Sequence, residues 1–183
     1  MQRIRTLFVI LVIALLAGCA GDDKPAATTP APGQIRAHAT LKATSNSHVS
    51  GTLQLAATDN GVHITGQIRG LQPDSDHGFH IHANGDCSAP DAKSAGGHFN
   101  PANAPHGHPD FGPRHAGDMP NQHANADGVA TVDVTAHDIE LGTGSDTDVL
   151  GGAIIVHAKP DDYTSQPSGA AGARIACGVI TAD

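Results

Sequence analysis

The sequence lacks tryptophan and holds few of the residues that build large aromatic cores. Its 183 residues include one Tyr, four Phe and two Met, and only 15% are charged. Lysine and arginine number 10 against 18 aspartates and glutamates, which gives a formal net charge of -8. Because phosphate contacts need clustered cations, this balance argues against a nucleic-acid-binding protein. The hydrophobic fraction of 39% is nevertheless sufficient for the core of one domain.

Glycine, proline and histidine are abundant instead. The chain has 22 Gly and 12 Pro, which favours short strands joined by loops over a bundle of helices. The 13 histidines are the unusual feature of the composition. Either they are scattered over the surface, or several of them share one site.

A basic start and a short apolar run open the chain. Arg3 and Arg5 precede the apolar segment 7–16, which is too short to span a bilayer comfortably and ends in the tetrapeptide LAGC at 16–19. This tetrapeptide resembles the bacterial lipobox, whose cysteine is lipidated and becomes the first residue of the mature protein. The alternative is a plain signal peptide, or a short membrane anchor, in which Cys19 is incidental.

The lipobox interpretation divides the chain into three parts. We expect a signal peptide over 1–18, a lipidated cysteine with a Pro-rich flexible tether over 19–33, and one folded domain over 34–183. The lipid on Cys19 would anchor an exported, periplasm-facing lipoprotein of the cell envelope. Because Ala20 rather than Asp follows the cysteine, the outer membrane is favoured over the inner one.

Two cysteines remain once Cys19 is set aside. In an exported domain, Cys87 and Cys177 indicate one disulfide, with two free thiols as the alternative. Such a bond would close a long loop and stabilise the fold by about 4 kcal/mol in the chain-entropy account.

The folded part alternates apolar and polar residues with a period of two, which is typical of β-strands. Segments of this kind, or short apolar runs, cover 35–43, 49–57, 62–68, 78–83, 128–135, 152–158 and 174–180. A turn signal, TDNG at 58–61, joins the second and third segments as a hairpin. The stretch from Asn84 to Asp127 is rich in Gly, Pro, His and Asp, and so long a loop in a compact domain is usually functional.

Several histidines are spaced as metal ligands. The side chains of His80 and His82 project from the same face of a strand, where they could bind one metal ion. Such a pair is also common as ordinary polar residues of a strand. His157 ends an apolar strand segment, where an inward-facing imidazole is either a ligand or a hydrogen-bonded core residue. The long loop adds three imidazoles and a carboxylate, a donor set suited to tetrahedral zinc. These four are His98, His106, His115 and Asp118.

Sequence motifs around these histidines carry a resemblance to a known family. They are GFHIH at 78–82, AGGHFNP at 95–101, HAGDMP at 115–120 and GARIACGVI at 172–180. In this order and spacing they resemble the copper/zinc superoxide dismutases, over most of the folded domain. The resemblance implies an all-β fold, an eight-stranded Greek-key β-barrel (an immunoglobulin-like sandwich) with a long metal-binding loop and a short electrostatic loop.

The resemblance also implies copper and zinc as cofactors. The implied copper ligands are His80, His82, His98 and His157. The implied zinc ligands are His98, His106, His115 and Asp118, so that His98 bridges the two ions. His108 lies close to His106 in sequence, but the spacing to His98 and His115 selects His106.

Further residues have counterparts in the family. Asp161 matches the carboxylate that links the histidines of both metals, and Arg174 matches the guanidinium beside the copper. Cys87 and Cys177 match the disulfide within the subunit. The segment between Asp161 and Arg174 is short and contains no lysine, which resembles bacterial members.

The implied activity is dismutation of superoxide to oxygen and hydrogen peroxide. Copper would cycle between Cu(II) and Cu(I), zinc would be structural, and Arg174 and His98 would be the catalytic residues. Bacterial members occur as monomers and as dimers, so a homodimer stays open. The alternatives are a non-catalytic copper/zinc-binding lipoprotein of the same fold and a His-rich metal scavenger, although histidines spaced singly along the chain argue against a scavenger.

The histidines without a counterpart among the ligands are expected at the surface. They are His38, His48, His63, His77, His108, His123 and His137. Of these, His108 and His123 could bind stray metal. Lys93, in the long loop, is expected to be a solvated lysine rather than a guide for the substrate.

Overall fold

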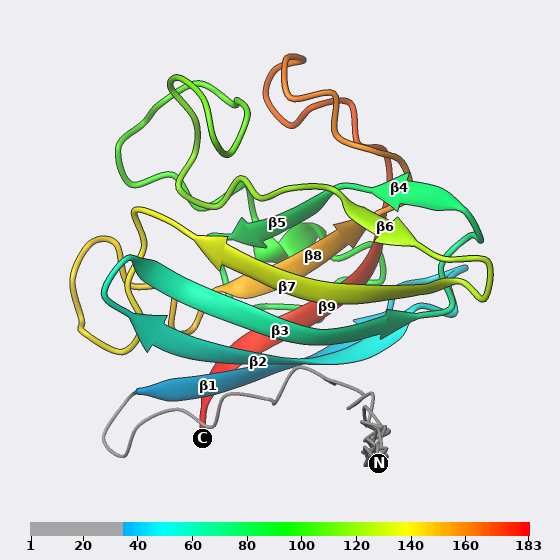
Figure 1. Ribbon diagram of the computed structural model, residues 1–183, viewed down its shortest axis with the longest axis horizontal. Coiled ribbons are helices and arrows are strands. Elements are labelled where there is room, and N and C mark those ends of the chain that lie inside the picture. The colour runs from blue at the N-terminus through cyan, green and yellow to red at the C-terminus, as the bar shows by residue number, and fades with distance from the viewer. Residues whose placement is uncertain (1–34) are drawn as a thin grey trace, which may run out of the picture.

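The computed structural model describes residues 35–183 as an all-β domain with one short 3-10 turn (Figure 1). The strands are β1 (Arg36–Ala43), β2 (Ser50–Thr58), β3 (Gly61–Arg69), β4 (Ser75–His77), β5 (Phe79–His82), β6 (Gln122–Ala124), β7 (Val129–Ala136), β8 (Ala153–His157) and β9 (Arg174–Ala182), and the turn η1 is Lys93–Ala95. The expected signal peptide, Cys19 and the whole of the tether over 19–33 lie outside the described residues. Within the described part, no helix is long and apolar enough to cross a bilayer.

Seven strands form one antiparallel sheet in the order β5-β8-β9-β1-β2-β3-β7, and β4 pairs with β6 in a second, small sheet. The spatial order differs from the order in the sequence. The last strand, β9, pairs between β8 and β1, and β7 pairs with β3 to form one edge of the sheet. Such long returns are the mark of a Greek key. Figure 1 shows the large sheet curling, with β5 and β8 behind β7 and β3. The expected all-β Greek-key fold is confirmed, with the small β4–β6 pair in addition to the expected strands.

The hairpin of β2 and β3 forms where the turn signal predicts it. Thr58 pairs with Gly61 across the turn, and Gly61 has a φ of 128°, a value that L side chains rarely adopt. Along both strands the apolar residues alternate inward, so that Leu55 lies opposite Ile64. The alternation therefore fixes which face of the hairpin is buried.

The core is aliphatic, as the scarcity of aromatic residues requires. It takes buried side chains from both ends of the curled sheet, including Phe79 and Ile81 of β5 and Val132 of β7. Because Phe79 and Ile81 point into this core, the alternate residues of β5 point to the opposite face of the strand. Those residues are His80 and His82, and they are buried as well.

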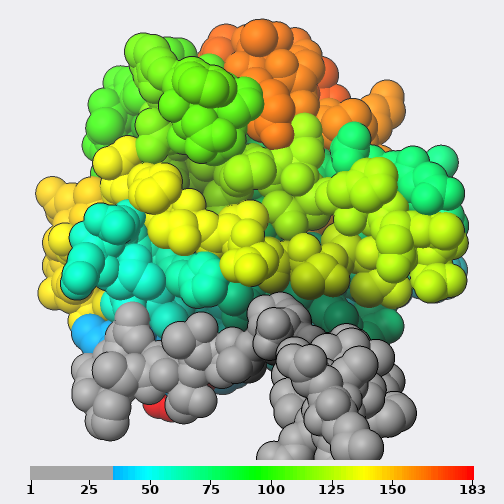
Figure 2. Space-filling model, viewed as in Figure 1, coloured from blue at the N-terminus to red at the C-terminus, as the bar shows by residue number. Residues whose placement is uncertain are grey.

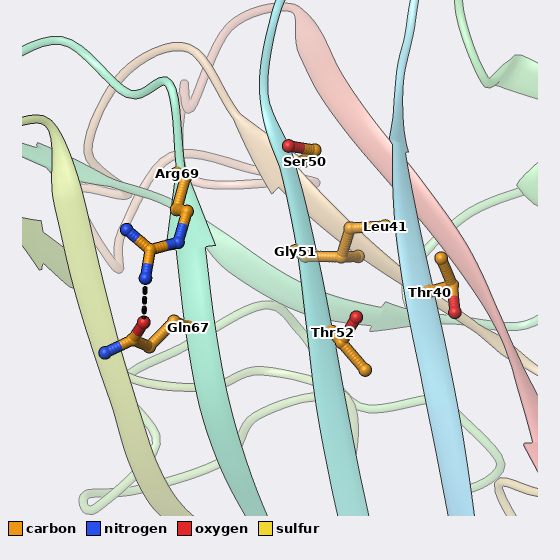
Figure 3. A pocket seen from close by; sticks show the side chains of 7 residues that line it. All are labelled: Thr40, Leu41, Ser50, Gly51, Thr52, Gln67 and Arg69. Atoms are coloured by element: carbon orange, nitrogen blue, oxygen red, sulfur yellow. Dashed lines mark hydrogen bonds between the residues drawn. The ribbon is translucent and has the colours of Figure 1, made fainter.

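The outer face of β1, β2 and β3 is polar and slightly hollowed. The depression has a volume of about 560 Å³, and Arg69 donates a hydrogen bond to Gln67 Oε1 at 2.5 Å. Figure 3 draws the side chains that line it, with this bond as a dashed line. The remaining lining residues are Thr40, Leu41, Ser50, Gly51 and Thr52. None of them belongs to the histidine clusters, so this face of the sheet is separate from the metal ligands expected from the sequence.

A disulfide joins Cys87, in the loop after β5, to Cys177 of β9, with a Cα–Cα distance of 5.8 Å. The bond expected from the cysteine count is therefore confirmed. It ties the beginning of the long loop to the strand that carries Arg174.

Replacing both cysteines by serine should lower the stability of the domain by about 4 kcal/mol, because the bond spans 90 residues of sequence and restricts the unfolded chain. The midpoint of urea unfolding, measured with and without reductant, checks this. An unchanged midpoint would show that the loop is held without the disulfide.

Candidate metal centre

Two groups of buried side chains come close enough to hold metal ions. The first is His80, His82, His98 and His157, and the second is His98, His106, His115 and Asp118. Within each group the potential ligand atoms lie within 4.8 Å of one another. His98 belongs to both groups. The structure thus brings together every residue that the sequence analysis expected as a copper or zinc ligand.

The first group is assembled by adjacent strands. β5 supplies His80 and His82, and β8, which pairs with β5, ends at His157. The pairing of β8 with β9 is irregular between Val156 and His157, and such an irregularity re-aims a side chain. His98 comes from the long loop and forms a β-bridge with His82. The ring centroids of His80 and His98 lie 4.0 Å apart, and those of His80 and His157 lie 4.9 Å apart.

One nitrogen of each ring in this group is buried without a hydrogen-bond partner among the described residues. These atoms are His80 Nδ1, His82 Nε2, His98 Nε2 and His157 Nε2. Leaving a buried polar atom unpaired costs free energy, and such atoms are rare in native proteins. Four of them facing one another fit the ligand set of a metal ion.

The other nitrogen of each strand histidine is held by a specific partner. His82 Nδ1 donates to the carbonyl of Gly96 at 2.9 Å, and His157 Nδ1 donates to the carbonyl of Gly172 at 3.3 Å. His80 Nε2 donates to Asp161 Oδ2 at 2.7 Å. Because one ring nitrogen carries the proton, the other presents its lone pair to the shared centre.

Burial keeps these imidazoles uncharged. It lowers the pKa of His82 to about 2 and that of His157 to about 3. It also lowers the pKa of His80 to about 4, although the hydrogen bond to Asp161 acts in the opposite direction. Neutral imidazole is the form that binds metal, so the group is ready for an ion at neutral pH.

The metal-free protein should therefore lose stability as the pH falls below the unfolded histidine pKa of about 6.5. The unfolded chain takes up protons there, whereas the low pKa values of His80, His82 and His157 keep these rings neutral in the fold until about pH 4, 2 and 3. Each pH unit below 6.5 should therefore cost up to about 1.4 kcal/mol per histidine. Urea midpoints measured between pH 7 and pH 5 check this, with the exposed His48→Ala variant as a control that keeps the slope. A midpoint that rises towards pH 5 would contradict it.

The second group is centred on the carboxylate of Asp118. Its Oδ1 lies 2.7 Å from His98 Nδ1, 3.0 Å from His106 Nδ1 and 3.3 Å from His115 Nδ1. Its Oδ2 accepts the backbone N–H groups of Gly107 and His115 at 3.1 and 2.9 Å, which orients the carboxylate. Burial alone would raise the pKa of Asp118, but the hydrogen bonds from His106 and His98 outweigh it and hold that pKa far below its usual range. Three imidazoles and one carboxylate are a zinc donor set.

Asp161 connects the two groups. Its Oδ2 accepts from His80 Nε2 at 2.7 Å, and its Oδ1 accepts from His106 Nε2 at 2.9 Å. The side chain of Asn121 bonds to both the N–H and the carbonyl of Asp161, a contact that sequence reasoning missed because the two lie far apart in the chain. Gly169, with a φ of 65°, passes so close that a Cβ there would lie 1.6 Å from Asp161 Oδ1.

Arg174 stands at the start of β9 beside the first group. Its Nη1 donates to the carbonyl of Ala92 at 2.7 Å, and its Nη2 donates to the carbonyl of Gly96 at 2.6 Å. Burial lowers its pKa, yet a guanidinium stays cationic at any physiological pH. Arg174, His82, His98 and His157 line a cavity of about 430 Å³. The cavity thus presents one fixed positive charge next to the unpaired histidine nitrogens.

His108, His123 and Lys93 lie outside both groups, as expected. His108 Nδ1 accepts the N–H of Asp110 at 3.1 Å, so His106, not His108, faces Asp118. The His123 side chain is 65% exposed and bonds to Asp76. The Lys93 side chain is 81% exposed, pairs with Asp91 at 2.8 Å and does not line the cavity.

The expectation for His77 is wrong. Its relative exposure is only 2%, because the short strand β4 places it against β8 rather than in solvent. Its Nδ1 donates to the carbonyl of His157 at 2.8 Å, and its Nε2 contacts Ser75 Oγ at 2.9 Å. His77 therefore supports the backbone of a residue in the first group. The polar triplet SDH at 75–77 gives no sequence signal of burial. The burial of His77 follows only from its tertiary contact with His157.

Comparison with known proteins agrees with this geometry. The family model described as copper/zinc superoxide dismutase (SODC) matches residues 49–180. The chain belongs to the copper/zinc superoxide dismutase family. Membership makes it an oxidoreductase with copper and zinc as cofactors, and the two ligand groups provide a place for each ion.

The relatives of this chain include bacterial proteins. Superoxide dismutase [Cu-Zn] 2 of Aquifex aeolicus (strain VF5) is 44% identical over 151 residues, which cover 80% of this chain and 86% of that protein. Superoxide dismutase-like protein YojM of Bacillus subtilis (strain 168) is 36% identical over 191 residues, with 96% and 95% covered. The crystal structure of a SOD-like protein from Bacillus subtilis superposes with a TM-score of 0.69 at 40% identity, covering 77% of this chain and 95% of that one.

Replacing Asp118 by alanine should release zinc at least tenfold faster, since it removes the one carboxylate around which the three imidazoles gather. Chelator competition measures the rate. The exposed Asp127→Ala variant is the matched control, and its zinc release should equal that of the wild type. Unchanged release from the Asp118 variant would refute its assignment as a ligand.

Proposed function

We propose that the protein dismutates superoxide to oxygen and hydrogen peroxide in the cavity lined by Arg174, His82, His98 and His157. The observation that carries this proposal is the set of four unpaired, buried imidazole nitrogens, which face one another beside a fixed guanidinium. His80, His82, His98 and His157 would hold copper, and His98, His106, His115 and Asp118 would hold zinc. Copper in such a site supplies a one-electron couple between Cu(II) and Cu(I), whereas zinc supplies charge and rigidity without a redox change.

Arg174 attracts and orients the anionic substrate. The chain carries a formal net charge of -8, so its overall field repels superoxide. A guanidinium fixed by two carbonyls still has N–H groups free to donate towards the cavity. Arg174 thus creates a local positive focus at the place where the substrate must bind.

His98 handles a proton. Its Nδ1 faces the second group and its Nε2 faces the first, so the ring joins the two metal positions. We assign to Nε2 one proton, which it would accept when it is not bound to copper and would donate to the second superoxide. Copper would take the electron that the first superoxide loses on leaving as oxygen and would return it to the second superoxide, and a second proton from solvent would complete hydrogen peroxide. Two superoxide ions and two protons thereby yield one molecule of each product.

Metal reconstitution tests the proposal. Protein loaded with copper and zinc should remove superoxide catalytically, and protein loaded with zinc alone should not. One relative is named superoxide dismutase-like rather than superoxide dismutase. This name favours a second candidate function, that of a non-catalytic copper- and zinc-binding protein. Stoichiometric binding of both metals without turnover would favour that second function.

We also propose that the protein is exported and anchored in a membrane, facing the periplasm, by a lipid on Cys19. The support is the LAGC tetrapeptide after an apolar run, together with a disulfide of the kind that persists in oxidising compartments. The mass of the mature N-terminal peptide should match a Cys19 with a diacylglyceryl thioether and an acylated amine. The Cys19→Ser variant should be lost from the membrane fraction. An unmodified mature N-terminus beyond Cys19 would refute the anchor.

A further inference from the structure

Two loops stand side by side over the metal centre. Figure 2 shows the green loop around residues 100–115 next to the orange loop around 160–170, at one end of the molecule. Gln166, from the second loop, reaches into the first. Its Oε1 accepts the backbone N–H of His106 at 2.9 Å, and its Nε2 donates to the backbone carbonyl of His106 at 2.9 Å. The side-chain amide therefore pairs with both backbone groups of a residue 60 positions away.

The two hydrogen bonds from Gln166 are made to backbone groups of His106 that have no backbone partner among the described residues. Among the described residues, no backbone group bonds to the N–H or the carbonyl of His106. The ring of His106 lies between two carboxylates, with Nδ1 3.0 Å from Asp118 Oδ1 and Nε2 2.9 Å from Asp161 Oδ1. Its direction therefore depends on where the backbone of this irregular loop is placed. The amide of Gln166 fixes that backbone at His106 itself, next to the N–H of Gly107, which Asp118 Oδ2 accepts at 3.1 Å.

The contact between Gln166 and His106 lies next to the proposed substrate cavity. Pro167 and Ser168, the residues directly after Gln166, line the cavity together with Arg174. The loop before them is ordered by its own turn, in which Asp162 accepts the N–H groups of Thr164 and Ser165 at 2.9 and 2.8 Å. A loop that is stiff in itself and fastened to His106 at Gln166 places its cavity-lining residues at a fixed distance from the zinc ligands.

We propose that Gln166 is a positioning residue of the zinc site. It orients His106 through the backbone, and the zinc ligands in turn hold the wall of the copper cavity at Pro167 and Ser168. The effect on zinc stands on the contacts of Gln166 alone, while the effect on the cavity rests on the proposed function.

A pair of variants separates the two hydrogen bonds. Gln166→Met keeps the length of the side chain and removes both bonds, and Gln166→Glu keeps the acceptor and removes the donor. Gln54→Met is the matched control, because Gln54 is an exposed glutamine of β2 on the outer face of the sheet. Zinc release to a chelator from the copper-loaded protein should be about tenfold faster in Gln166→Met, the factor that corresponds to roughly 1.4 kcal/mol, and intermediate in Gln166→Glu. Copper content should stay unchanged in all variants.

Cobalt(II) placed in the zinc position supplies a second measurement, since its visible absorption reports ligand geometry. The spectrum should change in Gln166→Met and stay that of the wild type in Gln54→Met. If both Gln166 variants release zinc at the wild-type rate and keep the wild-type cobalt spectrum, the proposal is overturned. If Gln166→Met does not fold, Gln166→Glu decides by the same two readouts. A wild-type protein that holds both metals without dismutation would overturn the proposed function instead and leave the zinc result intact.

Discussion

Replacing His157 by alanine is expected to abolish copper binding and superoxide dismutation while zinc stays in place. His157 is one of the four residues with an unpaired buried nitrogen, and it contributes to the first group alone. Its ring stands 4.9 Å from that of His80, whereas every member of the second group comes from the long loop. Activity should fall by at least a thousandfold, to the background of the metal-free protein, because the redox couple is lost rather than weakened.

Metal analysis and activity of the same preparation measure this result. His137→Ala is the matched control, because His137 is exposed and its Nδ1 bonds to the carbonyl of Asn60, away from both groups. The control should keep one copper, one zinc and full activity. Copper retained at wild-type affinity in the His157 variant would refute the ligand assignment, and loss of both metals would show that the two groups are not separable.

Replacing Arg174 by alanine should leave both metals bound and slow dismutation by about 10- to 150-fold. A hydrogen bond to a charged group contributes about 1.5–3 kcal/mol, which corresponds to that range of rates. Arg174 also attracts superoxide over a longer distance, and the variant loses this attraction. The rate of the variant should therefore depend less on salt than that of the wild type. His82 keeps its bond to the carbonyl of Gly96, and the disulfide still ties the loop to β9, so copper should stay.

Two further variants isolate the cause. Arg174→Lys keeps the charge but not the planar fork, so its rate should lie between those of the wild type and the alanine variant. Arg36→Ala removes an exposed cation of β1 that does not line the cavity, and it should leave the rate unchanged. If the Arg174→Ala variant lost copper, the residue would be a structural support of the site rather than a contact for substrate.

Local patterns predict the parts of this protein that local forces determine. The alternation in β1, β2 and β3 and the turn at 58–61 appear as expected, because each strand buries one face and the turn residues suit a hairpin. His80 and His82 share a face for the same reason. The three-residue strands β4 and β6 are not predicted, since so short a segment has no visible period.

The unpredicted parts of the site are contacts between distant segments. The carbonyls of Ala92 and Gly96 that fix Arg174, the amide of Asn121 beside Asp161 and the amide of Gln166 on His106 carry no pattern in the sequence. The expectation for His77 fails for the same reason, because its burial depends on β8 rather than on its neighbours in the chain. Sequence motifs locate the histidines and the aspartate that the structure brings together, and only the folded chain shows what holds these side chains in position.

The central claim is that the four-histidine group beside Arg174 is a catalytic copper site. The most direct test is the decay of a pulse of superoxide, followed at known copper and zinc content per chain. Each copper should remove many equivalents of superoxide, at a rate that rises in proportion to copper content and falls with increasing salt. Protein with one copper and one zinc per chain that consumes no more than one equivalent of superoxide per copper would contradict it.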